Sequence, residues 1–125
     1  MSSFWVRGWF RLLVFIIGLN VAGIAAAQTV NTGAISGEVR DSSGAVLPGV
    51  SVEAASPALI EKVRTVVTDS NGRYSITELR PGEYTVTFSL PGFGTVKREG
   101  IALTAGFNAN VGADMKVGDI QETIT

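Results

Sequence analysis

Residues 69–86 read DSNGRYSITELRPGEYTV, two strand-like segments that each follow a turn containing glycine. In both segments, aromatic or aliphatic side chains alternate with polar ones. A period of two places alternate side chains on the same face of a β-strand. The residues that share this face are Tyr74, Ile76, Tyr84 and Val86, and the alternation continues beyond the stretch with Phe88 and Leu90. The stretch therefore predicts β-structure.

The two turns carry residues that reverse the direction of a chain. Asp69 and Asn71 are expected to accept backbone hydrogen bonds, and Gly72 is expected to supply a positive φ. Pro81 presets φ in the second turn, where Gly82 is expected to take the left-handed position. We interpret both turns as hairpin connections.

Beyond this stretch, short runs rich in Val, Ile, Thr, Tyr and Phe recur at intervals of roughly ten residues, which is typical of an all-β protein. No helix of convincing length is apparent after the first thirty residues. The predicted strands are 35–40, 50–54, 61–69, 73–76, 83–90, 95–99 and 107–117. Tyr74, Tyr84, Phe88 and Phe107 are assigned to the core, whereas either face of 61–69 could be buried. Seven strands exceed what one flat sheet needs to bury one face, so a two-sheet sandwich is predicted.

The first 27 residues have the layout of a secretory signal helix. Arg7 and Arg11 precede an apolar run from Leu12 to Ala27, which closes with three alanines. Cleavage is expected between Ala27 and Gln28. An uncleaved membrane anchor is the alternative, but the strongly apolar part is short for a span of about 20 residues.

Cleavage would leave 98 of the 125 residues, with eight basic against eleven acidic side chains and a formal charge of −3. Nucleic acid is not an expected partner, because a binder needs a basic face. The chain has no cysteine, so export brings no disulfides and stability must come from packing. The expected organisation is a signal peptide (1–27), a polar lead-in (28–32), the sandwich (33–117) and a tail (118–125).

A calcium loop is the chemical alternative for the opening stretch. Aligned on Gly72, the template D-x-[DN]-x-[DN]-G-x5-E is matched by Asp69, Asn71 and Glu78, but Val67 replaces the leading carboxylate. Such a loop normally joins two helices, whereas the flanking residues here favour strands. No metal site is therefore predicted.

The composition also argues against catalysis. Without His or Cys, the chain lacks the commonest general base and the strongest nucleophile. Glu38 and Glu53, expected on neighbouring strands, are the carboxylate pair that could hydrolyse a glycoside, but both occupy outward positions where a solvated charge is ordinary. We therefore predict a protein that is not an enzyme, with no catalytic, cofactor-binding or metal-binding residues and no cofactor.

Two features bear on binding. Phe93 lies in the turn 91–94, where an exposed ring could stack on a sugar. Residues 95–99, with Lys97, Arg98 and Glu99, form a short predicted edge strand that could pair with a partner strand, although charges on an edge more often block pairing.

Three stretches, in order along the chain, are GAISGEVRDSSGAVLPGVSV (33–52), TVVTDSNGRYSI (65–76) and LRPGEYTVTFSLPGF (79–93). Together they resemble the carboxypeptidase regulatory-like domain, a transthyretin-like Greek-key sandwich of seven strands that is sometimes grouped with carbohydrate-binding-like folds. The resemblance covers about residues 33–117. In that family these motifs mark turns and core strands, so the resemblance implies no active site here.

The signal peptide, this domain and the tail VGDIQETIT (117–125) look like the front of bacterial TonB-dependent outer-membrane receptors. There a similar sandwich precedes a plug and a barrel, toward which the tail would lead and which these residues lack. The resemblance implies a docking or spacing module, exported through the inner membrane to the periplasm or the outer membrane. Its partner would be a periplasmic protein or the rest of a receptor chain, with membrane contact only through the signal peptide or a barrel.

Other interpretations of the chain remain open. It could be a truncated receptor or a free-standing secreted sandwich, and the alternative function is a secreted carbohydrate-binding or surface-binding domain. An accessory domain of a metallocarboxypeptidase would need a catalytic domain upstream, for which a signal peptide directly before Gln28 leaves no room.

Overall fold

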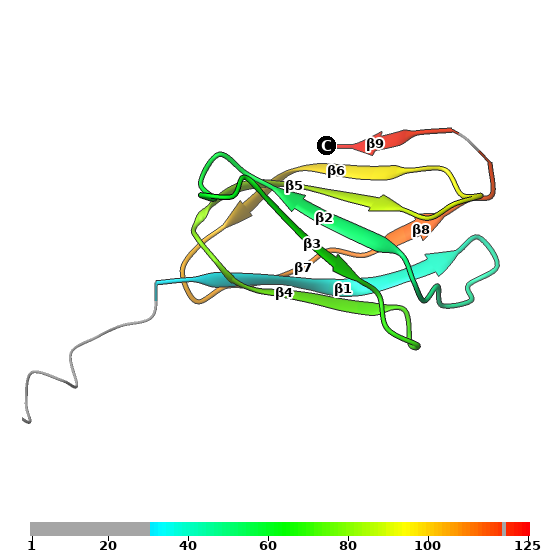
Figure 1. Ribbon diagram of the computed structural model, residues 1–125, viewed down its shortest axis with the longest axis horizontal. Helices are drawn as coiled ribbons and strands as arrows, with labels where there is room; N and C mark the ends of the chain where they lie inside the picture. The colour runs from blue at the N-terminus through cyan, green and yellow to red at the C-terminus, as the bar shows by residue number, and fades with distance from the viewer. Residues whose placement is uncertain (1–30, 119) are drawn as a thin grey trace, which may run out of the picture.

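The computed structural model of the chain describes residues 31–118 and 120–125 (Figure 1). The predicted signal peptide and its cleavage site lie outside these residues. Within them the fold is all-β, and no helix is long and apolar enough to cross a membrane. The strands are β1 (Gly33–Asp41), β2 (Ser51–Ala55), β3 (Val63–Val67), β4 (Arg73–Leu79), β5 (Gly82–Ser89), β6 (Val96–Leu103), β7 (Asn108–Asn110), β8 (Ala113–Met115) and β9 (Glu122–Ile124).

The strands form two sheets that face each other, which confirms the predicted sandwich (Figure 1). One sheet has the order β4-β1-β7, with β8 also paired to β1, and the other has the order β3-β2-β5-β6-β9. The segment predicted as one strand over 107–117 is divided into β7 and β8. Both pair in parallel with β1, at Ala34–Ser36 and at Val39–Asp41 respectively. The described residues therefore contain nine strands instead of the seven that were predicted.

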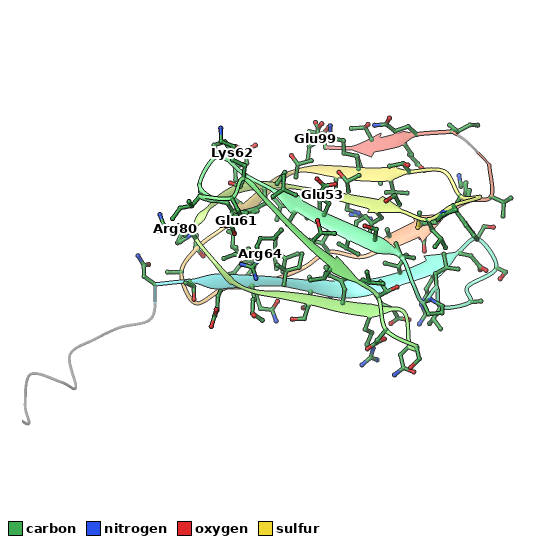
Figure 2. All side chains as sticks on the ribbon, in the orientation of Figure 1. Glu53, Glu61, Lys62, Arg64, Arg80 and Glu99 are labelled. Carbon is green, nitrogen blue, oxygen red and sulfur yellow. The ribbon has the colours of Figure 1, made fainter. Side chains whose placement is uncertain are left out.

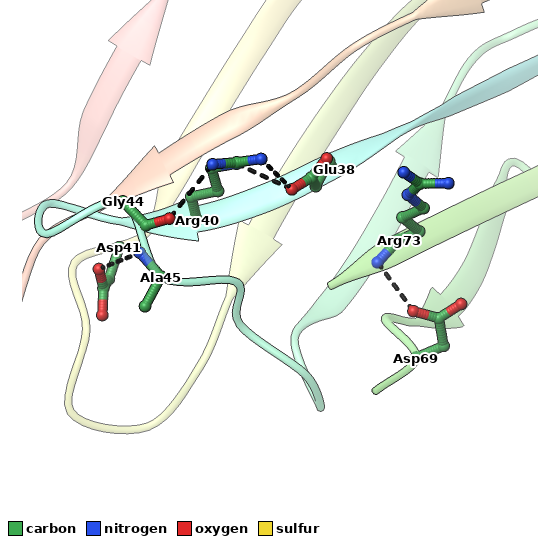
Figure 3. A network of polar contacts seen from close by, with 7 residues as sticks. All are labelled: Glu38, Arg40, Asp41, Gly44, Ala45, Asp69 and Arg73. Atoms are coloured by element: carbon green, nitrogen blue, oxygen red, sulfur yellow. Dashed lines mark hydrogen bonds and ion pairs between the residues drawn. The ribbon is translucent and has the colours of Figure 1, made fainter. Parts of the chain in front are cut away.

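The turn at 69–72 has the predicted chemistry but not the predicted role. Asp69 Oδ1 accepts hydrogen bonds from the backbone N–H groups of Asn71 and Arg73, at 2.9 and 3.0 Å (Figure 3 shows the bond from Arg73), and Gly72 has φ +72°. However, β3 lies in one sheet and β4 in the other. The turn is therefore a crossing between sheets, and its interpretation as a hairpin was wrong. Turn residues fix the local reversal, but the sheet each strand joins depends on contacts distant in sequence.

The second turn also crosses between the sheets, from β4 to β5. The prediction that Gly82 takes the left-handed position was wrong, because Gly82 does not have a positive φ. The residue near this turn with a positive φ is Glu78, at +57°. Gly82 is the first residue of β5, and a Cβ there would lie 2.8 Å from the Cβ of Ala58. Close approach of the chain therefore explains this glycine. The Tyr84 hydroxyl stabilises the turn by donating a hydrogen bond to the Arg80 carbonyl at 2.6 Å.

The core lies between the sheets and is built from the inward positions of both. Tyr74 and Phe88 meet edge to face, with ring centroids 5.7 Å apart. Buried side chains include Ile35, Val39, Val50, Val52, Ile76, Leu79, Tyr84, Val86 and Met115. The assignment of Phe107 to this core was wrong, because its side chain is 51% exposed. It precedes β7 in a tight turn where its backbone N–H donates to the Thr104 carbonyl.

The orientation of β3, which the sequence left open, is now defined. Val66 is half-buried against the core, whereas Val67 is 61% exposed. Arg64, labelled in Figure 2, donates from Nη2 to the Thr77 carbonyl of β4 at 3.3 Å. Its Nη1 lies 3.8 Å from Glu61. Arg64 therefore links the two sheets along their β3–β4 side.

Tyr74 offers a first prediction, because its hydroxyl donates to the Val111 carbonyl at 2.5 Å. Burial raises the pKa of Tyr74 well above its ordinary value of 10, and nearby Arg98 opposes the rise. Because the pKa is higher in the folded state, the neutral tyrosine favours folding. This contribution to the free energy of unfolding is complete below about pH 10, where the unfolded tyrosine titrates, and is lost as the pH rises further. Tyr74→Phe is expected to cost about 1 kcal/mol at pH 7. Between pH 9.5 and 11.5, the free energy of unfolding in urea should also fall less for this variant than for the unsubstituted protein. An equal fall in both proteins would contradict this account.

Candidate functional site

The residues of the calcium alternative do not come together. Asp69 and Asn71 lie in the turn before β4, whereas Glu78 lies near the far end of that seven-residue strand. At about 3.3 Å per residue, the strand separates them by more than 15 Å. Among the residues that the structure describes, no group of three or more acidic side chains is arranged to hold a metal ion.

Glu38 and Glu53 are also apart, because β1 and β2 belong to different sheets. The prediction that they lie on neighbouring strands was therefore wrong. Glu38 is 2.7 Å from Arg40 Nη2, and Arg40 Nη1 also donates to the Gly44 carbonyl at 3.2 Å (Figure 3). Glu53 lies at an outward position of β2 in the opposite sheet (Figure 2). These contacts indicate surface charges instead of a pair of catalytic acids.

Asp41 has a structural role in the turn after β1. Its Oδ1 accepts from the Ser43 hydroxyl at 2.5 Å and from the backbone N–H groups of Ser43 and Ala45 (Figure 3 shows the bond to Ala45). The Ser43 hydroxyl holds the pKa of Asp41 below its ordinary value, because the hydrogen bond favours the charged form. The carboxylate therefore stabilises the turn 41–45.

Phe93 does not present a free ring for a sugar. Its side chain is half-buried and packs against the core, and its backbone forms a β-bridge with Val117. The backbone N–H of Phe93 also donates to the Leu90 carbonyl at 3.0 Å. The expectation that this ring projects to solvent was therefore wrong, because the segment around Val117 returns alongside it.

The edge predicted at 95–99 is occupied by the tail of the same chain. β9 lies beside β6 in Figure 1 and pairs with it in parallel, with Glu122 opposite Val96 and Ile124 opposite Arg98. The Glu122 N–H donates to the Thr95 carbonyl at 2.8 Å. The sequence indicated an edge that can accept a strand but did not predict that residues 122–124 would supply it.

Beyond Arg98, a pocket opens between this edge and the opposite sheet. Its volume is about 340 Å³, and its lining includes Arg98, Ile101, Phe107, Val111 and Ile124. We call it the edge pocket. Apolar side chains from β6, β9 and the segment around β7 therefore line the pocket together with Arg98 and the polar residues Glu99, Asn110 and Thr125.

The charged side chains at the edge pocket differ in whether they have partners. Lys97 Nζ lies 3.6 Å from Glu99, so these two neighbours of Arg98 pair with each other. The Nε atom of Arg98 is buried and has no hydrogen-bond acceptor among the residues that the structure describes. A buried N–H without an acceptor is unfavourable, so the placement of Arg98 at this edge costs stability.

Gly94 controls how the tail docks. A Cβ at Gly94 would lie 2.2 Å from the Ile120 carbonyl oxygen, a contact that backbone can relieve only by moving. The φ of Gly94 is not left-handed, so alanine introduces no other strain.

Gly94→Ala is therefore expected to release residues 120–125 from β6 while the sandwich remains folded. Hydrogen exchange measured by mass spectrometry should show faster exchange in 120–125 and unchanged protection in β1 and β5. Thr95→Ala is the matched control, because it retains the carbonyl that accepts from Glu122. Unchanged exchange in the tail of the Gly94 variant would contradict the role assigned to this glycine.

Comparison with known proteins gives a family and a set of structural relatives. The family model of the carboxypeptidase regulatory-like domain matches residues 34–116. A search of the curated proteins found no match.

Three solved structures illustrate the range of proteins with this fold. A chain of the type II cohesin–X-dockerin complex from Acetivibrio cellulolyticus is 25% identical with a TM-score of 0.56, and the match covers 70% of this chain and 60% of that one. A streptococcal ancillary pilin is 19% identical with a TM-score of 0.54, covering 73% and 34%. The 3-chlorocatechol 1,2-dioxygenase from Rhodococcus opacus 1CP is 13% identical with a TM-score of 0.53, covering 73% and 62%. The matches thus span less than two thirds of each of these chains, and the last two show a shared fold alone.

Proposed function

The chain belongs to the carboxypeptidase regulatory-like domain family, and from this premise we propose that it is a non-enzymatic docking or spacing module at the N-terminal end of a TonB-dependent outer-membrane receptor. The β-sandwich and its similarity to cohesin–dockerin and pilin structures are consistent with a non-enzymatic module. The observation that carries the proposal is the docked tail. Residues 122–124, which in such a receptor would lead onward to the plug, are held as a strand on β6.

The proposed location follows from the sequence of the first 27 residues. Their layout supports export through the inner membrane. The module would then lie in the periplasm, either free or attached to the outer membrane through the rest of a receptor chain. Its partner would be that chain or another periplasmic protein, and no residue described here supports nucleic acid as a partner.

Cell fractionation tests this proposal directly. An antibody raised against residues 31–118 would be used on the native bacterium, after separation of the periplasm, the outer membrane and the culture medium. We expect the antigen in the outer-membrane fraction, on a polypeptide much larger than 13.1 kDa. A small polypeptide found only in the periplasm or the medium would overturn the receptor context and favour a free-standing secreted domain.

The carbohydrate-binding alternative receives no support from the residue on which it depended. Phe93 is packed against the core, and among the described residues Phe107 is the one exposed aromatic ring, beside an arginine. A sugar-binding platform normally needs an accessible aromatic face. A glycan array probed with the exported chain would revive this alternative if it gave specific binding.

A further inference from the structure

We propose that the chain forms a weak symmetric dimer in which β3 pairs antiparallel with β3 of a second copy, about a twofold axis that passes beside Thr65. Such self-association goes beyond the role proposed above and does not depend on it. Three features of the described residues carry it: a free backbone edge on β3, outward-facing residues that do not protect that edge, and a register that is complementary to itself.

The outer edge of β3 is unpaired within the part of the chain that the structure describes. β3 is the terminal strand of its sheet, with β2 on one side and no strand of that sheet on the other (Figure 1). On either side of β3, Lys62 and Thr68 continue the ladder toward β2: the Ser56 N–H donates to the Lys62 carbonyl and the Thr68 N–H to the Val50 carbonyl, both at 3.0 Å. Every second residue between them faces β2 in the same way, because hydrogen-bonded positions alternate along an antiparallel pair. The backbone groups that point away from β2 are therefore those of Val63, Thr65 and Val67.

The side chains of these three residues leave the edge accessible. All three are exposed on the outer face of the sheet, Val67 at 61%, and none is charged or a proline. The register of β3 with β2 contains no bulge. On the same side of the sandwich, β4 is the edge of the other sheet, and there the pairing with β1 shifts register near Glu78, which has φ +57°. Bulges, charges and prolines are features that protect an edge from pairing, and the outward-facing residues of β3 have none of them.

The sequence of β3 is complementary to itself in one antiparallel register. A twofold axis beside Thr65 places Thr65 opposite Thr65 of the second copy, and Val63 opposite Val67. Each of these residues then both donates and accepts across the new ladder, so the free backbone groups of the edge are paired. Thr–Thr and other β-branched pairs across strands stabilise a sheet. The two copies use the same surface, as a twofold dimer requires.

Arg64 is compatible with this register, although a charge that points inward from an edge strand can block pairing. Its Nη2 already donates to the Thr77 carbonyl, and its Nη1 lies 3.8 Å from Glu61 (Figure 2 labels both charged residues). The residue opposite Arg64 in the dimer is Val66 of the second copy. The guanidinium therefore keeps its own partners, and no like charges within β3 face each other.

The length of β3 limits the strength of the dimer. A strand of five residues contributes far less than the roughly 20 to 30 residues that each partner places in a standard interface. The dimer is therefore weak, and the fraction of chain in it depends on concentration.

Sedimentation velocity of the exported chain, from micromolar to millimolar concentration, tests the proposal. The mean mass should rise from that of a monomer toward that of a dimer. Thr65→Lys places two ammonium groups opposite each other and Thr65→Glu places two carboxylates, so each variant alone should associate about fivefold more weakly or worse. An equimolar mixture of the two variants should recover dimers, because lysine then faces glutamate across the axis.

Ser89→Lys and Ser89→Glu are the matched controls, because Ser89 is exposed on β5 in the middle of the same sheet. Both should dimerise like the unsubstituted chain. All four variants change exposed residues, so dilute samples should retain the urea midpoint of the unsubstituted chain. A monomer at every concentration, a dimer that Thr65→Lys leaves unchanged, or a mixture that stays monomeric would overturn the proposal. Growth beyond the dimer would also overturn it, because pairing of β3 with its copy uses up this edge.

Discussion

Gly37→Ala is expected to lower the free energy of unfolding by about 3 kcal/mol, at the upper end of the usual range for overpacking. A Cβ at Gly37 would lie 1.9 Å from the carbonyl oxygen of Val111 and 2.6 Å from its carbonyl carbon. Both atoms are backbone, so a side-chain rotation cannot relieve the contact. The same carbonyl accepts the Tyr74 hydroxyl, and the Val111 N–H donates to Ser36 at 2.8 Å.

The measurement for Gly37→Ala is equilibrium unfolding in urea, with Gly44→Ala as the control. Gly44 has φ +90° and open space around its Cα, so alanine there introduces backbone strain without a clash. That strain is expected to cost about 1 to 2 kcal/mol. If the two variants lose the same stability, the contact between Gly37 and Val111 does not have the role assigned to it.

Thr68→Val is expected to destabilise the protein by about 2 to 3 kcal/mol, although the two side chains have nearly the same shape. Thr68 is buried directly after β3, and its hydroxyl serves two backbone groups. Its Oγ1 accepts from the Val50 N–H at 2.9 Å and donates to the Leu47 carbonyl at 2.7 Å. Valine would leave the buried Val50 N–H without an acceptor.

Thr68→Ser is the control for the lost hydroxyl, because it removes only a methyl group. Its loss should be about 1 kcal/mol when both variants are unfolded in urea under the same conditions. If valine is tolerated better than serine, packing of the methyl group matters more at this position than the two hydrogen bonds.

Much of the fold could be predicted from the sequence, because burial in a two-sheet sandwich imposes a local period of two. The alternation from Tyr84 to Leu90 predicted β5 and its buried face, and Asp69 and Gly72 predicted a turn. The pairing of strands could not be obtained in the same way. β1 pairs with β4, β7 and β8, which lie far from it in sequence, and no local pattern specifies such partners.

The errors at individual residues have the same origin. Gly82 looked like a turn glycine, but the proximity of Ala58 explains it. Phe107 continues an apolar alternation, but the turn that precedes β7 directs its ring to the surface. Conversely, Lys97, Arg98 and Glu99 indicated a charged edge, yet nothing in their order distinguishes the arginine whose Nε is buried from its paired neighbours.

The parallel pairing of β9 with β6 has a mechanical consequence. Tension applied at Thr125 along the strand direction would load the three-residue β6–β9 ladder in shear before it reached the long strands of the core. That short ladder would yield first and leave residues 118–125 as a free segment with a full length of up to about 25 Å, at the 3.3 to 3.6 Å that each extended residue spans. The domain would therefore lengthen at its C-terminal end under load, by release of β9, while its sandwich stays folded.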